Sequence, residues 1–272
     1  MIVCIPTRGR INRQATYNSF PKYMKEKGEV VLVAPEEEVP LHKKAGRNCI
    51  ARPVNVISKV RQWICDNMAK DHKVIMADDD LGFFVRKEPT AYNLRPAEPD
   101  EVATIFYRIW DHLETVGMAG LSPRQMNNVH FPDRVIFNTK INAVQGVRTD
   151  IMDLIEAKYD DVEIMEDYHV VLSFLERGYG NAVLTDAAWD QVAASGSSGG
   201  CSLYRTPELQ KAGAFALNAL HPDFVSIVDK KPRTGWVGMQ TRTDVRVSWA
   251  KAYKHGSARY NYPEVRQSGE II

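Results

Sequence analysis

Short apolar segments that alternate with amphipathic ones are the feature that most constrains the fold of this chain. The apolar segments have the length of buried strands, and proline, glycine or charged residues close them. The segments between them place apolar residues at helical spacing. Such alternation predicts an α/β fold, with a mostly parallel, Rossmann-like central sheet flanked by helices. The expected strands of the first half are Ile2–Pro6, Glu29–Ala34, Lys73–Ala77 and Met118–Ser122, and the expected helices are Gln14–Lys27, Asn55–Lys70 and Pro99–Val116.

The second half of the sequence is less regular, and we interpret residues 1–272 as one domain made of the halves 1–122 and 123–272. The expected elements here are strands at 135–138, 143–147, 181–184 and Arg242–Tyr253, and helices at Glu163–Arg177 and Thr206–Leu220.

Composition excludes several classes of protein. Hydrophobic residues make up 44% and charged residues 25% of the chain, which is ordinary for a globular protein and argues against disorder. The formal net charge of +1 gives no general attraction to nucleic acid. The four cysteines form no CxxC pair, so a zinc site or a disulfide framework is not expected. Without an apolar run of about 18 residues or a signal-peptide pattern, we expect a cytoplasmic protein with no membrane segment.

Three consecutive aspartates, Asp78, Asp79 and Asp80, follow the apolar run KVIMA. Adjacent carboxylates repel one another unless a divalent cation or water compensates them. Alternation at a strand end places Asp78 and Asp80 on the same side. These two residues are therefore predicted to bind Mn²⁺ or Mg²⁺, with Asp78 and Asp79 near a diphosphate; a solvated acidic turn is the alternative.

The first strand ends in Pro6, Thr7, Arg8, Gly9 and Arg10. In a parallel sheet, ligands bind beyond the carboxyl ends of the strands, so this segment is expected beside the aspartates. A hydroxyl group and two guanidinium groups at a strand end can hold a nucleotide and its phosphates. Pro6, Thr7, Arg8 and Arg10 are therefore candidate nucleotide-binding residues, with a basic turn as the alternative.

Arg61 lies on the expected helix that precedes the aspartates, and it is a further candidate for a ribose or phosphate contact, or else a surface arginine.

Glu166 and Asp167 lie near the start of the expected helix Glu163–Arg177. Such carboxylates often only complement the helix dipole. Their functional interpretation is catalytic, with Asp167 as a general base that takes a proton from an acceptor hydroxyl. His221 could complete the metal shell, with His169 as an alternative, although a lone histidine is usually a satisfied polar group.

Together these motifs resemble those of the GT-A glycosyltransferases. The resemblance lies in IPTRGR, VISKVRQWI, ADDD as a DXD-type motif and MEDYH as an ED motif. A closer resemblance, to the phage TET-associated glycosyltransferases, runs from IPTRGR through QGVRTDI and MEDYHVVLSFLERGYGNAVL to YRTPELQKA and LHPDFV.

The resemblance implies a GT-A fold and a metal-dependent transfer of a hexose or pentose from a nucleotide-sugar, with a UDP-sugar expected. The half 1–122 would then bind the nucleotide-sugar, and the half 123–272 would bind the acceptor. It also implies 5-hydroxymethylcytosine in phage DNA as the acceptor, in the host cytoplasm, and no obligate protein partner is expected.

Other interpretations of the same sequence remain open. A nucleotidyltransferase or pyrophosphorylase with a related sheet has the same acidic site, but it usually has a more glycine-rich loop after its first strand. A non-catalytic DNA-binding protein would need neither metal nor nucleotide. The loop 195–200 could order over the donor as a lid, with a plain linker as the alternative. The aromatic residues Phe131, Phe137, Trp189 and Trp236 are candidates to stack on an acceptor, although such residues are more often core.

Overall fold

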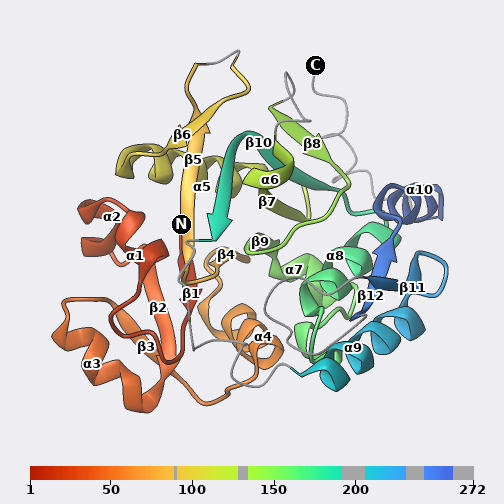
Figure 1. Ribbon diagram of the computed structural model, residues 1–272, viewed down its shortest axis with the longest axis horizontal. Helices are drawn as coiled ribbons and strands as arrows, with labels where there is room; N and C mark the ends of the chain where they lie inside the picture. The colour runs from red at the N-terminus through yellow and green to blue at the C-terminus, as the bar shows by residue number, and fades with distance from the viewer. Residues whose placement is uncertain (89–90, 128–133, 192–205, 231–241, 260–272) are drawn as a thin grey trace.

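The computed structural model describes residues 1–272 except 89–90, 128–133, 192–205, 231–241 and 260–272 (Figure 1). The strands of the described residues are β1 (Val3–Pro6), β2 (Val30–Pro35), β3 (Cys49–Arg52), β4 (Lys73–Ala77), β5 (Leu81–Arg86), β6 (Leu94–Pro96), β7 (Met118–Pro123), β8 (Val135–Phe137), β9 (Val144–Arg148), β10 (Asn181–Gln191), β11 (Val225–Lys230) and β12 (Arg242–Val247). The helices are α1 (Ala15–Ser19), α2 (Lys22–Glu26), α3 (Val39–Lys44), α4 (Ile57–Met68), α5 (Pro99–His112), α6 (Arg124–Asn127), α7 (Thr149–Leu154), α8 (Glu166–Glu176), α9 (Pro207–Leu220) and α10 (Trp249–Arg259), with 3-10 turns η1 (Glu36–Glu38) and η3 (Tyr159–Asp161).

One large sheet forms the centre of the protein, in the order β3-β2-β1-β4-β9-β7-β10-β5-β6, with β8 paired to β10. Strands β3, β2, β1 and β4 are parallel. Strand β9 is antiparallel to both β4 and β7, so β7 and its parallel neighbour β10 point the same way as β4. Among the described strands of this sheet, only β5, β8 and β9 oppose that direction. The predicted α/β fold with a mostly parallel central sheet is confirmed.

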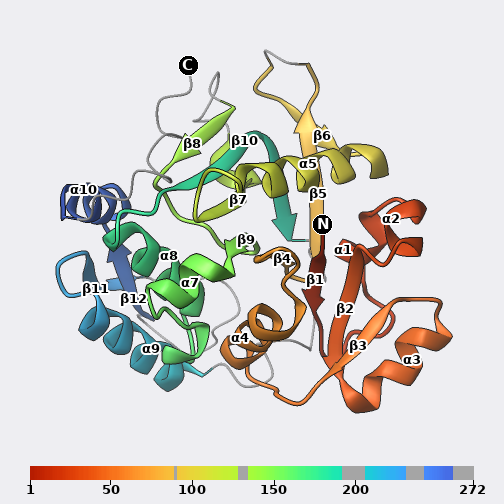
Figure 2. The ribbon, with the colours of Figure 1, turned by 180° about the vertical axis from the view of Figure 1, so that it is seen from behind.

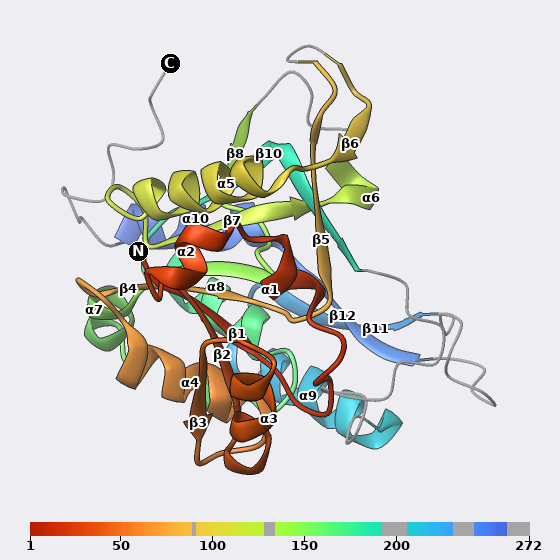
Figure 3. The same ribbon diagram turned by 90° about the vertical axis from the view of Figure 1, so that its left-hand side faces the viewer.

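Helices cover both faces of the sheet because side chains along its strands alternate between two cores. On β4, Val74 and Met76 belong to the core shared with α4, α8, α9 and α10. Ile75 and Ala77 belong to the core shared with α1, α2 and α5. Figure 3 shows α5 and α4 on opposite sides of the sheet, and Figure 2 shows α5 in front of β7. Strands β1 and β4 are therefore buried on both faces, and their ends are fixed.

The last described elements form a small unit beside α8. Strands β11 and β12 pair antiparallel, α9 contacts both, and α10 packs on α8 (Figure 1). The close approach of α10 needs glycine at two positions: Gly178, which ends α8 with a φ of +83°, and Gly256, whose backbone faces the backbone of Leu175. This unit belongs to the less regular half expected from the sequence.

Two predicted elements are wrong. The helix expected at Gln14–Lys27 is two short helices, α1 and α2, because Pro21 lacks the N–H that a continuous helix needs. The strand expected at Arg242–Tyr253 ends at Val247, and α10 begins at Trp249. The sequence from Trp249 is rich in alanine and lysine, which favour helix over strand. Strands β3, β5, β6 and β11 have no counterpart among the elements predicted from the sequence.

Candidate active site

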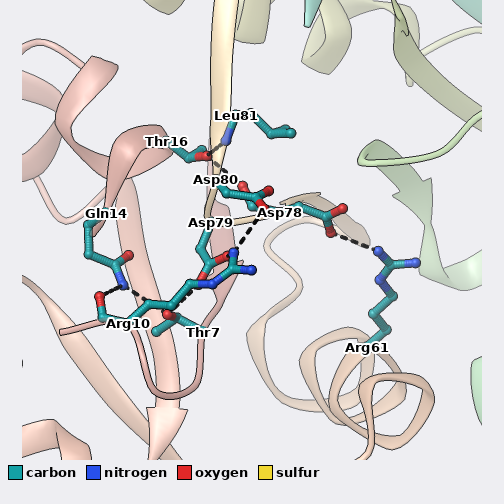
Figure 4. A network of polar contacts seen from close by, with 9 residues as sticks. All are labelled: Thr7, Arg10, Gln14, Thr16, Arg61, Asp78, Asp79, Asp80 and Leu81. Carbon is teal, nitrogen blue, oxygen red and sulfur yellow. Dashed lines mark hydrogen bonds and ion pairs between the residues drawn. The ribbon is translucent and has the colours of Figure 1, made fainter. Parts of the chain in front are cut away.

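The three aspartates occupy the turn between β4 and β5, at the edge of the sheet where β1 also ends. Thr16 holds this turn in place: its hydroxyl donates to the carbonyl of Asp78 and accepts from the backbone N–H of Leu81 at 2.9 Å (Figure 4). The turn lines a cavity of about 530 Å³. The proximity expected from strand order is therefore present, since Pro6, Thr7, Arg8 and Arg10 line the same cavity.

Asp79 points away from the others and is only 5% exposed. Its carboxylate accepts a hydrogen bond from the Thr7 hydroxyl at 2.6 Å and another from Arg10. Gln14 in turn donates to the Thr7 oxygen at 2.8 Å. Burial raises the pKa of Asp79 to about 6, because desolvation outweighs the stabilisation from Thr7 and Arg10. Asp79 thus ties the end of β1 to the end of β4 at the cavity wall.

Asp78 and Asp80 are the more exposed members, with side chains 34% and 27% exposed. One oxygen of each is held by an arginine: Arg61 Nη2 lies 3.0 Å from Asp78 Oδ1, and Arg10 Nη1 lies 2.9 Å from Asp80 Oδ2. The other oxygen of each carboxylate makes no hydrogen bond with the described residues. Figure 4 shows the two arginines reaching the turn from opposite sides.

The donor set of this turn fits a divalent cation such as Mg²⁺ or Mn²⁺. Carboxylate oxygens are the ligands these ions prefer, and Mg²⁺ is commonly held by one or two carboxylates together with substrate phosphates and water. Within the part of the chain that the structure describes, no group of three or more His, Cys, Asp or Glu side chains is arranged to hold a metal. Asp78 and Asp80 would therefore share the cation with a ligand's oxygens.

Four of the acids at this turn pair with two arginines. Among the described residues, Asp78, Asp79, Asp80 and Glu166 form ion pairs with the guanidinium groups of Arg10 and Arg61. Burial raises the pKa of Asp78 although Arg61 opposes the shift. The cavity wall also carries the cationic residues Arg8, Arg52, Lys140 and Arg242 and the acids Asp167 and Asp244.

Helix α8 brings the second acidic pair to the cavity. Glu166 is buried and accepts a hydrogen bond from Arg61 Nη1 at 2.8 Å. Burial raises the pKa of Glu166, with Arg61 opposing the shift. Asp167 is half-buried, and among the described residues its side chain accepts only from the neighbouring backbone N–H of Tyr168, at 3.0 Å. Both residues line the cavity, so the structure brings the two acidic motifs together.

His221 lies elsewhere. At the end of α9 its Nε2 is 2.9 Å from Nδ1 of His169, and its Nδ1 is 2.6 Å from Glu176. His169 also bonds to Asp161 at 3.2 Å. Neither histidine lines the cavity of the aspartates. The structure therefore does not bring His221 to Asp78 and Asp80, because Glu176 and His169 hold its ring in a separate buried cluster.

Several cavity residues were not candidates from the sequence. They come from β3 and the loop after it, from the segment before β9, and from α8, α9 and β12, and include Arg52, Asn55, Lys140, Tyr168, Gln210, Arg242 and Asp244. Lys140 lies over the Tyr168 ring, 4.7 Å from its centroid, next to Asp167. Arg52 ends a strand that the sequence analysis missed, and a correct assignment of that strand would have placed it at this edge.

The aromatic candidates do not line the cavity where they are described. Phe137 is partly exposed on β8, and the Trp189 indole donates to the Leu121 carbonyl at 2.9 Å. Phe131, Trp236 and the loop 195–200 lie outside the described residues.

The family model described as "TET-Associated Glycosyltransferase" matches residues 1–200. The chain belongs to the TET-associated glycosyltransferase family. The membership and the enzyme class expected from the IPTRGR, ADDD and MEDYH motifs are thus confirmed: this family member is a glycosyltransferase. The match ends before α9, so Gln210, Arg242 and Asp244 reach the cavity from outside the matched segment. No curated protein matches the sequence.

Solved structures resemble this TET-associated glycosyltransferase in broad arrangement only. S. aureus TarS has a TM-score of 0.49 and 14% identity, with 80% of this chain and 66% of that chain covered. GalNAc-T7 with UDP, GalNAc and Mn²⁺ has a TM-score of 0.47 and 10% identity, with 80% and 48% covered. The inositol-1-phosphate CTP transferase from T. maritima has a TM-score of 0.40 and 14% identity, with 76% and 93% covered.

No helix among the described residues has the length and apolar character needed to cross a membrane.

Proposed function

We propose that this glycosyltransferase moves a sugar from a nucleotide-sugar to an acceptor hydroxyl, with a divalent cation at Asp78 and Asp80. The observation that carries the proposal is the arrangement of the cavity. Two carboxylates, each with one oxygen held by arginine and one left open, share it with Arg8 and with Asp167. The residues proposed to bind the donor and the residue proposed to activate the acceptor therefore line the same cavity.

The donor side is formed by the aspartate turn and the end of β1. A bound Mn²⁺ or Mg²⁺ would neutralise the negative charge that develops on the leaving diphosphate. Arg8 is half-buried in the cavity wall, and the described residues provide it with no ion-pair partner. Its guanidinium group is therefore available to bind a phosphate, as the sequence predicts. Thr7 and Asp79 act on this side by fixing the wall against which the nucleotide lies.

The acceptor side is formed by the start of α8. Asp167 lines the cavity and forms no ion pair within 4.0 Å among the described residues, so its carboxylate can accept a proton from the acceptor hydroxyl. Lys140 and Tyr168 lie beside it and can bind the acceptor. A transfer that inverts the anomeric centre would use Asp167 as this base.

We propose 5-hydroxymethylcytosine in phage DNA as the acceptor, and the support for it is family membership. The hydroxymethyl group of a paired base lies in the major groove, which admits protein. Flipping the base into the cavity is the alternative route and costs a few kcal/mol. Lys140 supplies positive charge on this side of the cavity for the DNA backbone, whereas Arg242 pairs with Asp244 at 2.6 Å.

The test measures nucleoside diphosphate release from a panel of sugar nucleotides with Mn²⁺ and DNA that contains 5-hydroxymethylcytosine. Unmodified DNA is the acceptor control. Asp80→Asn is the site variant, and Asp160→Asn, an exposed aspartate of η3, is the matched control. We expect release that requires both the metal and the modified base, and a loss of at least a hundredfold in Asp80→Asn only.

Release of pyrophosphate in place of nucleoside diphosphate would instead identify a nucleotidyltransferase. Metal-independent DNA binding without release from any donor would identify a binding protein. Turnover that ignores the modified base would remove DNA as the acceptor and keep the transferase.

A further inference from the structure

Arg61 connects the two acidic motifs of the cavity. It is on α4, its side chain is 7% exposed, and its two terminal nitrogens bind different carboxylates. Nη2 donates to Asp78 at 3.0 Å, and Nη1 donates to Glu166 at 2.8 Å. The remaining nitrogen, Nε, is buried without a partner among the described residues. Each terminal nitrogen of Arg61 thus has a carboxylate partner within the protein, which holds the guanidinium plane between the two acidic motifs.

Only an arginine can make this connection. A planar guanidinium group presents its terminal nitrogens in a fixed fork, so one side chain can bind two carboxylates in a defined geometry. A lysine keeps the charge but has a single nitrogen on a flexible stem. Since Glu166 is 6% exposed, loss of its partner would leave a buried carboxylate uncompensated.

The start of α8 depends on this contact because the usual cap is missing. Met165, the residue before the helix, has a left-handed backbone with a φ of 70°, and no side-chain hydrogen bond caps the helix there. A non-glycine residue in this conformation costs of order 1 kcal/mol or more and persists only where surrounding contacts fix it. The pair between Glu166 and Arg61 is a polar contact that ties this helix start to a distant element, α4, so it sets the position of the next residue, Asp167.

We propose that Arg61 and Glu166 are positioning residues that set the distance between the metal-binding turn and Asp167, and that neither binds the nucleotide. This inference rests on the proposed function and refines it. Glu166 is directed to Arg61 and acts through it on Asp78, whereas Asp167 is the acid that faces the acceptor. The carboxylate of Glu166 is needed as a hydrogen-bond acceptor only.

The experiment compares Arg61→Lys, Glu166→Ala and Glu166→Gln with the wild-type enzyme. Arg108→Lys is the matched control, because Arg108 forms a 2.9 Å ion pair with Asp186 and does not line the cavity. Five quantities are measured: kcat and donor KM for sugar transfer, the Kd for UDP with Mn²⁺, the thermal midpoint, and hydrogen exchange of the first turn of α8. The last is independent of activity.

We expect Arg61→Lys and Glu166→Ala to lower kcat at least tenfold, to leave the Kd for UDP within threefold, and to speed exchange at the start of α8. Glu166→Gln should retain at least a third of kcat and wild-type exchange, because an amide oxygen still accepts from Arg61.

Three results would overturn the inference. One is a tenfold weaker UDP affinity in Arg61→Lys with kcat preserved, since that would make Arg61 a nucleotide ligand. Another is Glu166→Gln as inactive as Glu166→Ala, since that would make Glu166 an acid or base. The third is unchanged exchange in Arg61→Lys. If the wild type turns over no donor, the proposed function fails, while the exchange data still decide whether Arg61 positions α8.

Discussion

Thr7→Val tests whether the end of β1 is held by the aspartate turn. Valine has nearly the shape of threonine, so the substitution removes the hydroxyl and little else. Thr7 is only 3% exposed. Its hydroxyl donates to Asp79 at 2.6 Å and accepts from Gln14 at 2.8 Å. A hydrogen bond to a charged group contributes about 1.5–3 kcal/mol. In the variant the Gln14 amide still donates to the Arg10 carbonyl at 2.9 Å, so the loss of the hydrogen bond from Gln14 to Thr7 adds little.

We therefore expect Thr7→Val to lower the free energy of unfolding by about 2–3 kcal/mol. For a domain of this size the thermal midpoint would fall by roughly 4–12 °C. The assay is urea denaturation followed by fluorescence, with thermal melts beside it. Thr104→Val is the control, because the Thr104 hydroxyl is exposed on α5 and bonds only to the Asp100 carbonyl one turn back. A loss below 0.5 kcal/mol in Thr7→Val, or an equal loss in the control, would refute this account of the turn.

Three further predictions concern other parts of the molecule. Gly256→Val should lower the free energy of unfolding in urea by about 2–3 kcal/mol, because a Cβ there would lie 2.6 Å from the Glu176 carbonyl carbon and closer still to the Leu175 oxygen; a stable variant would contradict the packing of α10. Burial, with His221 beside it, lowers the pKa of His169 to about 4, so the neutral ring stabilises the fold fully above the unfolded pKa near 6.5. The free energy of unfolding of the wild type, measured in urea relative to that of His169→Gln, should therefore fall by up to about 3 kcal/mol as the pH drops from 6.5 toward 4, since the buried acids with raised pKa values titrate alike in both proteins. Asp80→Asn should weaken Mn²⁺ binding at least tenfold by calorimetry, and EDTA should abolish sugar transfer. If the variant binds Mn²⁺ with wild-type affinity, the cation does not bind at Asp80.

The first half of the fold could be predicted because its signals are local. Strands β1, β2 and β4 are buried on both faces, so they appear in the sequence as continuous apolar runs. The aspartates follow directly from the position of KVIMA. Strand β3 could not be predicted because only its first and last residues are buried. Its four residues therefore show neither a continuous apolar run nor an alternation of apolar and polar side chains.

The partners of each acid could not be predicted, because they lie far away in the sequence. Glu166 and Asp167 are adjacent and chemically similar, yet one is paired inside the protein and the other faces the cavity. The choice depends on Arg61, 105 residues earlier. The position of His221 depends likewise on Glu176, 45 residues away. A sequence pattern shows which residues can do chemistry, but only packing shows which ones are free to do it.

The order of the chain has a consequence for how the enzyme matures. During synthesis the segments that carry Thr7 and Asp79 leave the ribosome before α8. Until then Arg61 has only one of its two acidic partners among the described residues, and the proposed base, Asp167, is not in place. Contacts of such long sequence separation slow folding. The strands on either side of the aspartate turn pair with β9 and β10, so the cavity is complete only when the second half of the chain has folded against the first.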